Sequence, residues 1–174
     1  TDTGATPLWM ACFKGHIETV KLLLAQDGIE VNRARPDTGV TPFSIACSHG
    51  RIEIVKLLLA KAGIDVNKAK NDGMTPLSNA CYDGYTNVVK LLLEQPGIDV
   101  NKTKDKVLTP LIYACLRGHI KIVKLLLAKA GIEVNKAVAG GVTPLYMACI
   151  RGRTEIIKLL LAHDGIEVNQ AGTF

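Results

Sequence analysis

The 174-residue chain lacks long apolar runs, and only 5% of its residues are aromatic. No run approaches the roughly 18 consecutive apolar residues that a membrane-spanning helix needs, so we expect no membrane insertion. The start of the chain has no secretory signal pattern. The sequence also has no HExxH, no zinc-ligand spacing, no glycine-rich phosphate loop and no credible Ser/His/Asp arrangement. We therefore predict that the protein is not an enzyme and uses no metal or cofactor.

Cysteine is present in an odd number, five, and without a CxxC pair. Packed helices lie about 8–10 Å apart, which exceeds the Cα separation of about 7 Å that a disulfide tolerates. We interpret the cysteines as small, buried apolar residues. Five free thiols favour a reducing compartment, so we expect an intracellular, cytoplasmic location. The cysteines are Cys12, Cys47, Cys81, Cys115 and Cys149.

What the sequence does contain is one motif, Thr-Pro-Leu/Phe-x-x-Ala-Cys, five times over, with steps of 35, 34, 34 and 34 residues. A fixed period of this size indicates a stacked repeat array. Each unit of such an array contacts only its neighbours, so the array offers a long surface rather than one deep pocket. The motif begins at Thr6, Thr41, Thr75, Thr109 and Thr143.

One repeat, residues 41–75, is typical of two helices followed by a protruding turn. Thr41 suits a helix cap, the proline after it suits the first helical position, and Gly50 suits the end of the helix. We expect a second helix from about Ile52 to Lys61, apolar except for a narrow stripe. An Asn-Asp-Gly turn signal precedes the next repeat. Small Ala-Cys side chains in the first helix, against Leu-Leu-Leu in the second, predict a stack that is concave on the first-helix side.

This pattern resembles the ankyrin repeat, whose signature is Thr-Pro-Leu-His-x-Ala, then a Gly-His pair and an apolar second helix. Gly15-His16 and Gly118-His119 match the Gly-His pair, and a Val-Asn pair recurs in all five repeats. The resemblance covers essentially the whole chain. It implies an all-α repeat solenoid of stacked helix-turn-helix units with protruding turns or β-hairpins and a concave face. The expected single domain spans 1–174, with repeats at approximately 1–34, 35–69, 70–103, 104–137 and 138–174.

The chain departs from the family pattern at positions that the family uses for local hydrogen bonds. Its period is one residue longer than the usual 33. Three repeats carry Arg51, Tyr85 or Arg153 at the second position of the Gly-His pair. The histidine that follows Thr-Pro-Leu in the family is replaced in every repeat, by Trp9, Ser44, Ser78, Ile112 and Tyr146.

The net charge is +5, but acidic and basic residues recur side by side. In three second helices a glutamate precedes a lysine by three residues, as Glu18 precedes Lys21. Pairing at this spacing reduces the basic field. We therefore disfavour nucleic acid as a partner and keep salt-sensitive binding of a polyanion to the lysine columns as an alternative.

The positions that differ between repeats are the ones free to recognise a partner. Six of the eight aromatic residues occupy them, and aromatic residues are enriched at binding hot spots. For Trp9 and Tyr146 the alternative is that the ring fills the place of the missing histidine. Phe13 and Tyr82 occupy a column that the resemblance places on the exposed concave side. The predicted partner-binding residues are Trp9, Phe13, Lys14, Asp37, His49, Asp72, Tyr82, Asp83, Lys106, Tyr113, Arg117, Tyr146 and Arg151.

We predict a protein–protein interaction module or scaffold that binds another protein through its turn tips and concave first-helix face. The alternatives are a spacer, or an engineered or consensus-like ankyrin scaffold without a partner of its own. The second helix of the last repeat is as apolar as the internal ones, whereas terminal units normally carry a polar outer face. We therefore expect a piece of a longer array, or ends that associate with another chain.

Overall fold

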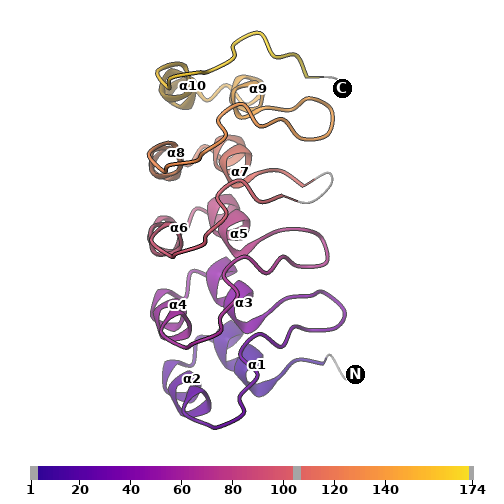
Figure 1. The fold of residues 1–174 in the computed structure, drawn as a ribbon, viewed down its shortest axis with the longest axis vertical. Coiled ribbons are helices and arrows are strands. Elements are labelled where there is room, and N and C mark those ends of the chain that lie inside the picture. Colours follow the sequence, from indigo (N-terminus) through magenta and orange to yellow (C-terminus); the bar gives the residue numbers. More distant parts are fainter. Residues whose placement is uncertain (1–3, 104–106, 173–174) are drawn as a thin grey trace.

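The computed structural model describes residues 4–103 and 107–172. Within them ten α-helices form five pairs, and Figure 1 shows the pairs stacked along one axis. The first helices of the pairs are α1 Pro7–Lys14, α3 Pro42–Ser48, α5 Pro76–Asp83, α7 Pro110–Arg117 and α9 Pro144–Ile150. The second helices are α2 Ile17–Leu24, α4 Ile52–Leu59, α6 Thr86–Leu93, α8 Ile120–Leu127 and α10 Thr154–Leu161. The two sets form separate columns, and long turns project beyond the first helices (Figure 1).

Each first helix begins at the Thr-Pro of the repeated motif. In α5 the hydroxyl oxygen of Thr75 accepts a hydrogen bond from the Ser78 amide at 3.1 Å, and proline occupies the first helical turn. The hydroxyl satisfies an amide that has no partner within the helix. Gly84 then ends the helix with a φ of +83°, which a side chain would oppose. The predicted starts are confirmed. In the repeat at residues 41–75, the second helix, α4, ends at Leu59 rather than at the expected Lys61.

The core runs the length of the stack, between the two columns of helices. Second-helix leucines such as Leu58, Leu92 and Leu126 are completely buried, as are the small Ala46 and Cys47 of α3. Neighbouring first helices contact each other more extensively than neighbouring second helices do. Small side chains allow this closer approach at normal packing density. Closer packing of the first helices than of the second helices is what the predicted concave first-helix side requires.

The cysteines are all free, as expected, but one of them is not buried. Cys12, Cys47, Cys81 and Cys115 lie in the core, whereas Cys149 of α9 is exposed. The prediction of five buried thiols is therefore wrong for Cys149. Each of the other cysteines is covered by the first helix of the following repeat, and α9 has no following first helix among the described residues.

Asparagines of the Val-Asn pairs join each repeat to the next. The side-chain amide of Asn101 donates to the Gly131 carbonyl at 2.7 Å, and its oxygen accepts from the Glu133 amide at 3.0 Å. Asn67 makes the same two bonds to Gly97 and Asp99. One side chain thereby satisfies two backbone groups of the neighbouring repeat, which explains why the pair recurs in every unit.

The protruding segments are turns rather than the β-hairpins that the resemblance allowed. Within residues 4–103 and 107–172 the pairing is limited to one isolated bridge, Val138 with Val142. Other turns close on two backbone bonds, such as Lys70 N–H to the Met74 carbonyl at 3.0 Å and Gly73 N–H to the Lys70 carbonyl at 2.9 Å. Adjacent tips also touch, because the Asn71 amide donates to the Thr38 carbonyl at 2.9 Å. Too few bonds form to extend a strand.

Large apolar side chains remain exposed at both ends of the stack. Leu22 of α2 is 69% exposed, and Leu161 of α10 is 49% exposed. The equivalent leucines of the internal repeats are half-buried or buried, and their helices have a second helix on either side. The predicted apolar outer faces are thus present, and what covers them stays a prediction. In the described part of the chain, no helix combines the length and the apolar character needed to cross a membrane.

Candidate partner-binding surface

The C-terminal halves of the first helices carry a row of side chains that we call the first-helix face. Their positions are aligned because each helix starts at Thr-Pro and has nearly the same length. All of them are half-buried or exposed. The first-helix face comprises Phe13, Lys14, His49, Tyr82, Asp83, Leu116, Arg117 and Arg151.

The first two repeats contribute an aromatic group, the N-terminal cluster, made of Trp9, Phe13, Lys14, Arg35 and His49. Phe13 stacks on Trp9 with ring centroids 5.4 Å apart and meets the His49 ring edge-on at 5.0 Å. Lys14 Nζ lies 5.2 Å from the Phe13 ring, and Arg35 Cζ lies 5.0 Å from the Trp9 ring. Trp9 is only 6% exposed, so it supports Phe13 from beneath, as the packing alternative for that position requires.

Repeats three and four form a second group, the central cluster, made of Tyr82, Asp83, Tyr113 and Arg117. The two tyrosine rings meet edge-to-face at 5.5 Å, and Arg117 Cζ lies 4.6 Å above the Tyr82 ring. Burial raises the pKa of the Asp83 carboxyl, and the positive charge of Arg117 only partly offsets this effect. Burial likewise raises the pKa of the Tyr113 hydroxyl. The cluster therefore presents rings and a cation at one place on the surface.

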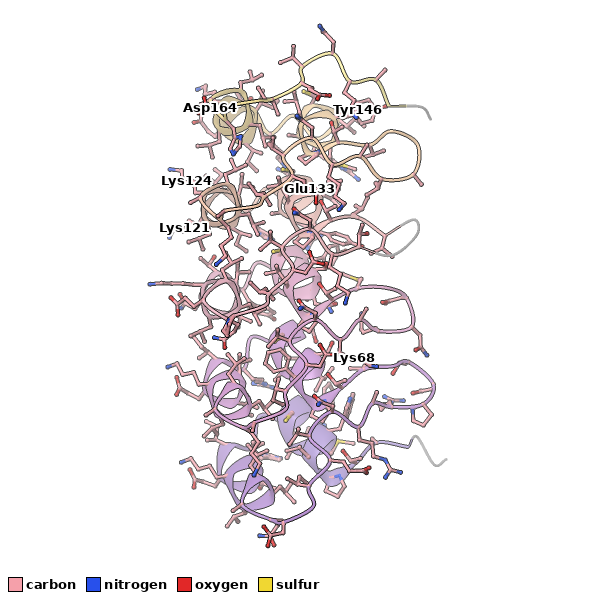
Figure 2. The ribbon with its side chains drawn as sticks, in the orientation of Figure 1. Lys68, Lys121, Lys124, Glu133, Tyr146 and Asp164 are labelled. Carbon is pink, nitrogen blue, oxygen red and sulfur yellow. The ribbon has the colours of Figure 1, made fainter. Side chains whose placement is uncertain are left out.

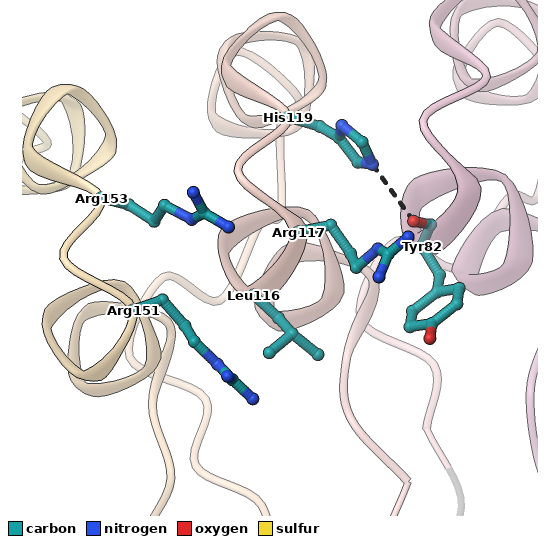
Figure 3. A pocket seen from close by; sticks show the side chains of 6 residues that line it. All are labelled: Tyr82, Leu116, Arg117, His119, Arg151 and Arg153. Atoms are coloured by element: carbon teal, nitrogen blue, oxygen red, sulfur yellow. Dashed lines mark hydrogen bonds between the residues drawn. The ribbon is translucent and has the colours of Figure 1, made fainter.

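Beside the central cluster lies a hollow of about 310 Å³, which we call the arginine pocket. Arg117 extends toward Tyr82 of the third repeat, whereas Arg151 and Arg153 extend from the last repeat toward the fourth, with Leu116 between the two sides (Figure 3). His119 donates from Nε2 to the Tyr82 carbonyl oxygen at 3.1 Å, because a carbonyl only accepts. The residues that line the pocket are Tyr82, Leu116, Arg117, His119, Arg151 and Arg153.

The predicted tip residues are engaged within their own turns. Asp37 pairs with Arg35 at 2.6 Å, and Asp72 pairs with Lys70 at 3.0 Å. Both carboxylates remain about half exposed, so a partner can still reach them. Lys106 lies outside the described residues. The charged tips are thus more nearly neutral than their sequences suggested.

Tyr146 lies apart from both clusters. It follows the Thr143 cap, whose hydroxyl accepts from the Tyr146 amide at 3.1 Å, and its ring packs against Gly172. Its side chain is half-buried at the end of the stack, as Figure 2 shows. This placement favours a packing role, in which the ring fills the place of the missing histidine, over direct recognition of a partner.

Sequence reasoning missed Arg153 and Leu116 as members of the surface. Arg153 occupies the second position of the Gly-His pair, to which the resemblance gives a structural role. In agreement with that role, its side chain packs against Gly118. The signal was the presence of three arginines, at 117, 151 and 153, in two adjacent repeats. Leu116 occupies the same column as Phe13 and Tyr82 but is not aromatic.

A metal site has no support in the described ranges. Residues 4–103 and 107–172 contain no group of three or more His, Cys, Asp or Glu side chains placed to hold an ion. The charged side chains instead pair locally, as Glu18 does with Lys21 at 2.7 Å and Glu53 with Lys56 at 2.8 Å. The predicted spacing of these pairs is confirmed.

Comparison with known families agrees with this geometry. A family model described as ankyrin repeats (3 copies) matches residues 1–70, 32–104 and 101–171. No curated protein matches the chain. Ankyrin repeats generally mediate protein–protein interaction. With the motif, the paired helices and the family model in agreement over nearly the whole length, the chain belongs to the ankyrin-repeat family.

Proposed function

We propose that this chain is a protein-binding module, acting as one domain, and that it contacts its partner through the first-helix face and adjoining turn tips. The observation that supports this most is the pairing of rings with cations at half-exposed positions in successive repeats. Phe13 with Lys14, and Tyr82 with Arg117, combine large contact area with charge. Aromatic and arginine side chains are the residues that contribute most at protein interfaces.

The mechanism is recognition by a rigid, pre-organised surface. Phe13 is held between Trp9 and His49, and Tyr82 between Tyr113 and Arg117. A side chain that is already ordered loses little conformational entropy when a partner covers it. Tyrosine and phenylalanine also have few rotatable bonds to immobilise. A few such anchors then determine how slowly the partner dissociates.

The compartment is part of the same proposal. Five free cysteines, four of them in the core, suit a reducing environment such as the cytoplasm. A scaffold role, in which the array holds more than one partner, fits the separation of the N-terminal and central clusters onto different repeats.

The test is an affinity capture from cell lysate with the wild-type chain and a Phe13→Ala/Tyr82→Ala/Arg117→Ala variant. A matched control, Lys90→Ala/Lys121→Ala/Lys124→Ala, removes exposed side chains from the second helices. Figure 2 shows Lys121 and Lys124 on α8, in the second-helix column. Washes at low and high salt separate charge-driven retention from shape-driven retention. Circular dichroism confirms that each variant remains folded.

A protein kept at high salt by the wild type and the lysine control, but lost by the first-helix variant, is the expected result. Equal loss from both variants contradicts the assigned face. Retention of nucleic acid alone, released by salt, supports binding of a polyanion to the lysine columns instead. If no chain retains a protein, the spacer alternative replaces the proposal.

A further inference from the structure

The arginine pocket concentrates positive charge on one part of the surface. Three guanidinium groups and one imidazole line it. The ion pairs formed within residues 4–103 and 107–172 do not include Arg117, Arg151 or Arg153. The charge of Arg117 acts on the neighbouring Asp83 carboxyl, but no carboxylate is among the described residues that line the pocket. Cations therefore outnumber anions at this site.

Two of the three arginines are held in place before any ligand binds. The Arg117 guanidinium lies over the Tyr82 ring, and the Arg153 guanidinium lies close to the Gly118 backbone. A Cβ at Gly118 would come within 3.0 Å of Arg153 Cζ, so the glycine makes room for the arginine. Planar groups fixed in this way lose less entropy when they bind an oxyanion.

In the described part of the chain, the side-chain N–H groups of these arginines have no acceptor in the protein. An equivalent arginine in an earlier repeat does have one. Arg51 occupies the position of Arg153 and donates from Nη2 to the Phe13 carbonyl at 3.4 Å. Within the described part of the chain, Arg117, Arg151 and Arg153 form no hydrogen bond of this kind. Guanidinium donors that face a hollow and lack protein acceptors suit carboxylate or phosphate oxygens.

We propose that the arginine pocket binds an acidic segment of a protein partner, whose carboxylate or phosphate groups pair with Arg117, Arg151 and Arg153 along the surface. The inference rests on the proposed protein-binding function and gives the chemistry of the partner. A volume of about 310 Å³ accommodates an acidic side chain or a phosphorylated one. Leu116 supplies an apolar wall, and the Tyr82 ring supplies a second surface for the peptide.

A peptide fits the site better than a nucleic acid does. A nucleic acid needs positive charge that follows its backbone over many phosphates, whereas this charge is confined to two repeats. On the side of the earlier repeats the first-helix face continues with the acidic Asp83, and in the N-terminal cluster Arg35 is paired with Asp37. The next tip toward the end of the chain, at Val138–Gly140, carries no charge. The unpaired lysines Lys121 and Lys124 belong to the second helix α8.

The test is fluorescence anisotropy with labelled peptides on the full chain. The probes are hexaglutamate, a neutral hexaglutamine of the same length, a peptide with one phosphoserine, and a six-phosphate oligothymidylate. The test variant is Arg117→Gln/Arg151→Gln/Arg153→Gln. The matched control, Lys90→Gln/Lys121→Gln/Lys124→Gln, removes the same formal charge from the second helices. Arg151→Gln alone is included, because Arg151 is exposed and its loss leaves the Gly118 and Tyr82 contacts intact.

The expected result is binding of an acidic peptide, but not of hexaglutamine, by the wild type and the lysine control. The triple arginine variant should bind roughly tenfold or more weakly, since hydrogen bonds between ionised groups are about twice as strong as neutral ones. The single variant should show a smaller loss in the same direction. Whether hexaglutamate or the phosphoserine peptide binds more tightly identifies the source of the oxyanion.

Three results would overturn the inference: no binding of either acidic peptide, equal weakening by the arginine and lysine variants, or tighter binding of the oligothymidylate. These outcomes are separable from failure of the proposed function. If the acidic peptides fail while a protein is still captured through Phe13 and Tyr82, the partner chemistry is wrong and the function stands. If capture fails as well, both are wrong.

Discussion

The imidazole of His119 lies against Gly84 of the preceding repeat, so closely that a Cβ on this glycine would come within 2.7 Å of His119 Cε1. The same relationship joins Tyr85 to Gly50 and Arg153 to Gly118. The second position of the Gly-His pair therefore docks each repeat onto the helix end of the one before. This contact explains why a glycine recurs there even though its neighbour varies.

Replacing Gly84 with alanine should destabilise the protein through two separate effects. Its φ of +83° opposes a side chain, at about 1–2 kcal/mol, and the new methyl group would displace His119. Gly131→Ala is the matched control, because Gly131 has a φ of +81° and open space around it. Urea unfolding should show a larger loss for Gly84→Ala than for Gly131→Ala. Equal losses would mean that His119 moves without cost.

The asparagine bridge predicts a second stability effect. Asn101→Ala removes the two hydrogen bonds that this side chain makes to the fourth repeat, at Gly131 and Glu133. We expect a loss of about 1 kcal/mol, because the freed backbone groups are partly exposed to water. The control is Asn87→Ala on the exposed side of α6, where the change should be close to neutral. A neutral result for Asn101 would show that water replaces the bridge fully.

The packing of the second helices predicts the largest loss. Leu92 is completely buried in α6, so Leu92→Ala should cost about 2–5 kcal/mol by leaving a cavity. Leu22→Ala, at a position that is 69% exposed, should change stability little. Thermal or urea unfolding measures both. Unchanged unfolding of the Leu92 variant would contradict the assignment of this residue to the core.

The fold was largely predictable from the sequence because all five repeats carry the same structural motif at nearly the same spacing. Thr-Pro, Gly and the leucine run each have a local physical role, and five copies at one spacing exclude an accidental match. The end of the second helix was less predictable: the expected last residue Lys61 instead donates to the Leu24 carbonyl of the preceding repeat at 2.9 Å. That bond depends on a neighbour in space, which periodicity alone does not show.

The candidate surface was only partly predictable for the same reason. Phe13, Tyr82 and Arg117 are predicted as binding residues because their columns vary between repeats. In the structure Phe13 contacts Trp9, His49 and Lys14, and Tyr82 contacts Tyr113 and Arg117. Trp9 varies as well, but its ring is buried and is not presented to a partner. Variation between repeats identifies the positions that the repeated motif does not fix. Whether a side chain at such a position is exposed depends on which side chains of the neighbouring repeat cover it.

Thiol reactivity should distinguish Cys149 from the other cysteines. In the native protein at pH 8, a water-soluble disulfide reagent should modify Cys149 rapidly, because it is exposed. The other four are buried, and burial raises the pKa of the Cys12 and Cys115 thiols to about 12, so they are neutral and shielded. Mass spectrometry should find one label on the wild type and none on Cys149→Ser. Rapid labelling of several cysteines would contradict the tight stack.

The same buried thiols predict that stability falls at alkaline pH. In the unfolded chain Cys12 and Cys115 ionise near 9.0, but in the folded protein their pKa is about 12. Between these values the native state holds protons that the unfolded state has released, so the free energy of unfolding decreases as pH rises. Each thiol contributes at most about 1.4 kcal/mol per pH unit in that window. Urea unfolding at pH 8, 9 and 10 should give a steeper decline for the wild type than for Cys12→Ala/Cys115→Ala. Parallel declines would assign the alkaline loss to lysine and tyrosine ionisation instead.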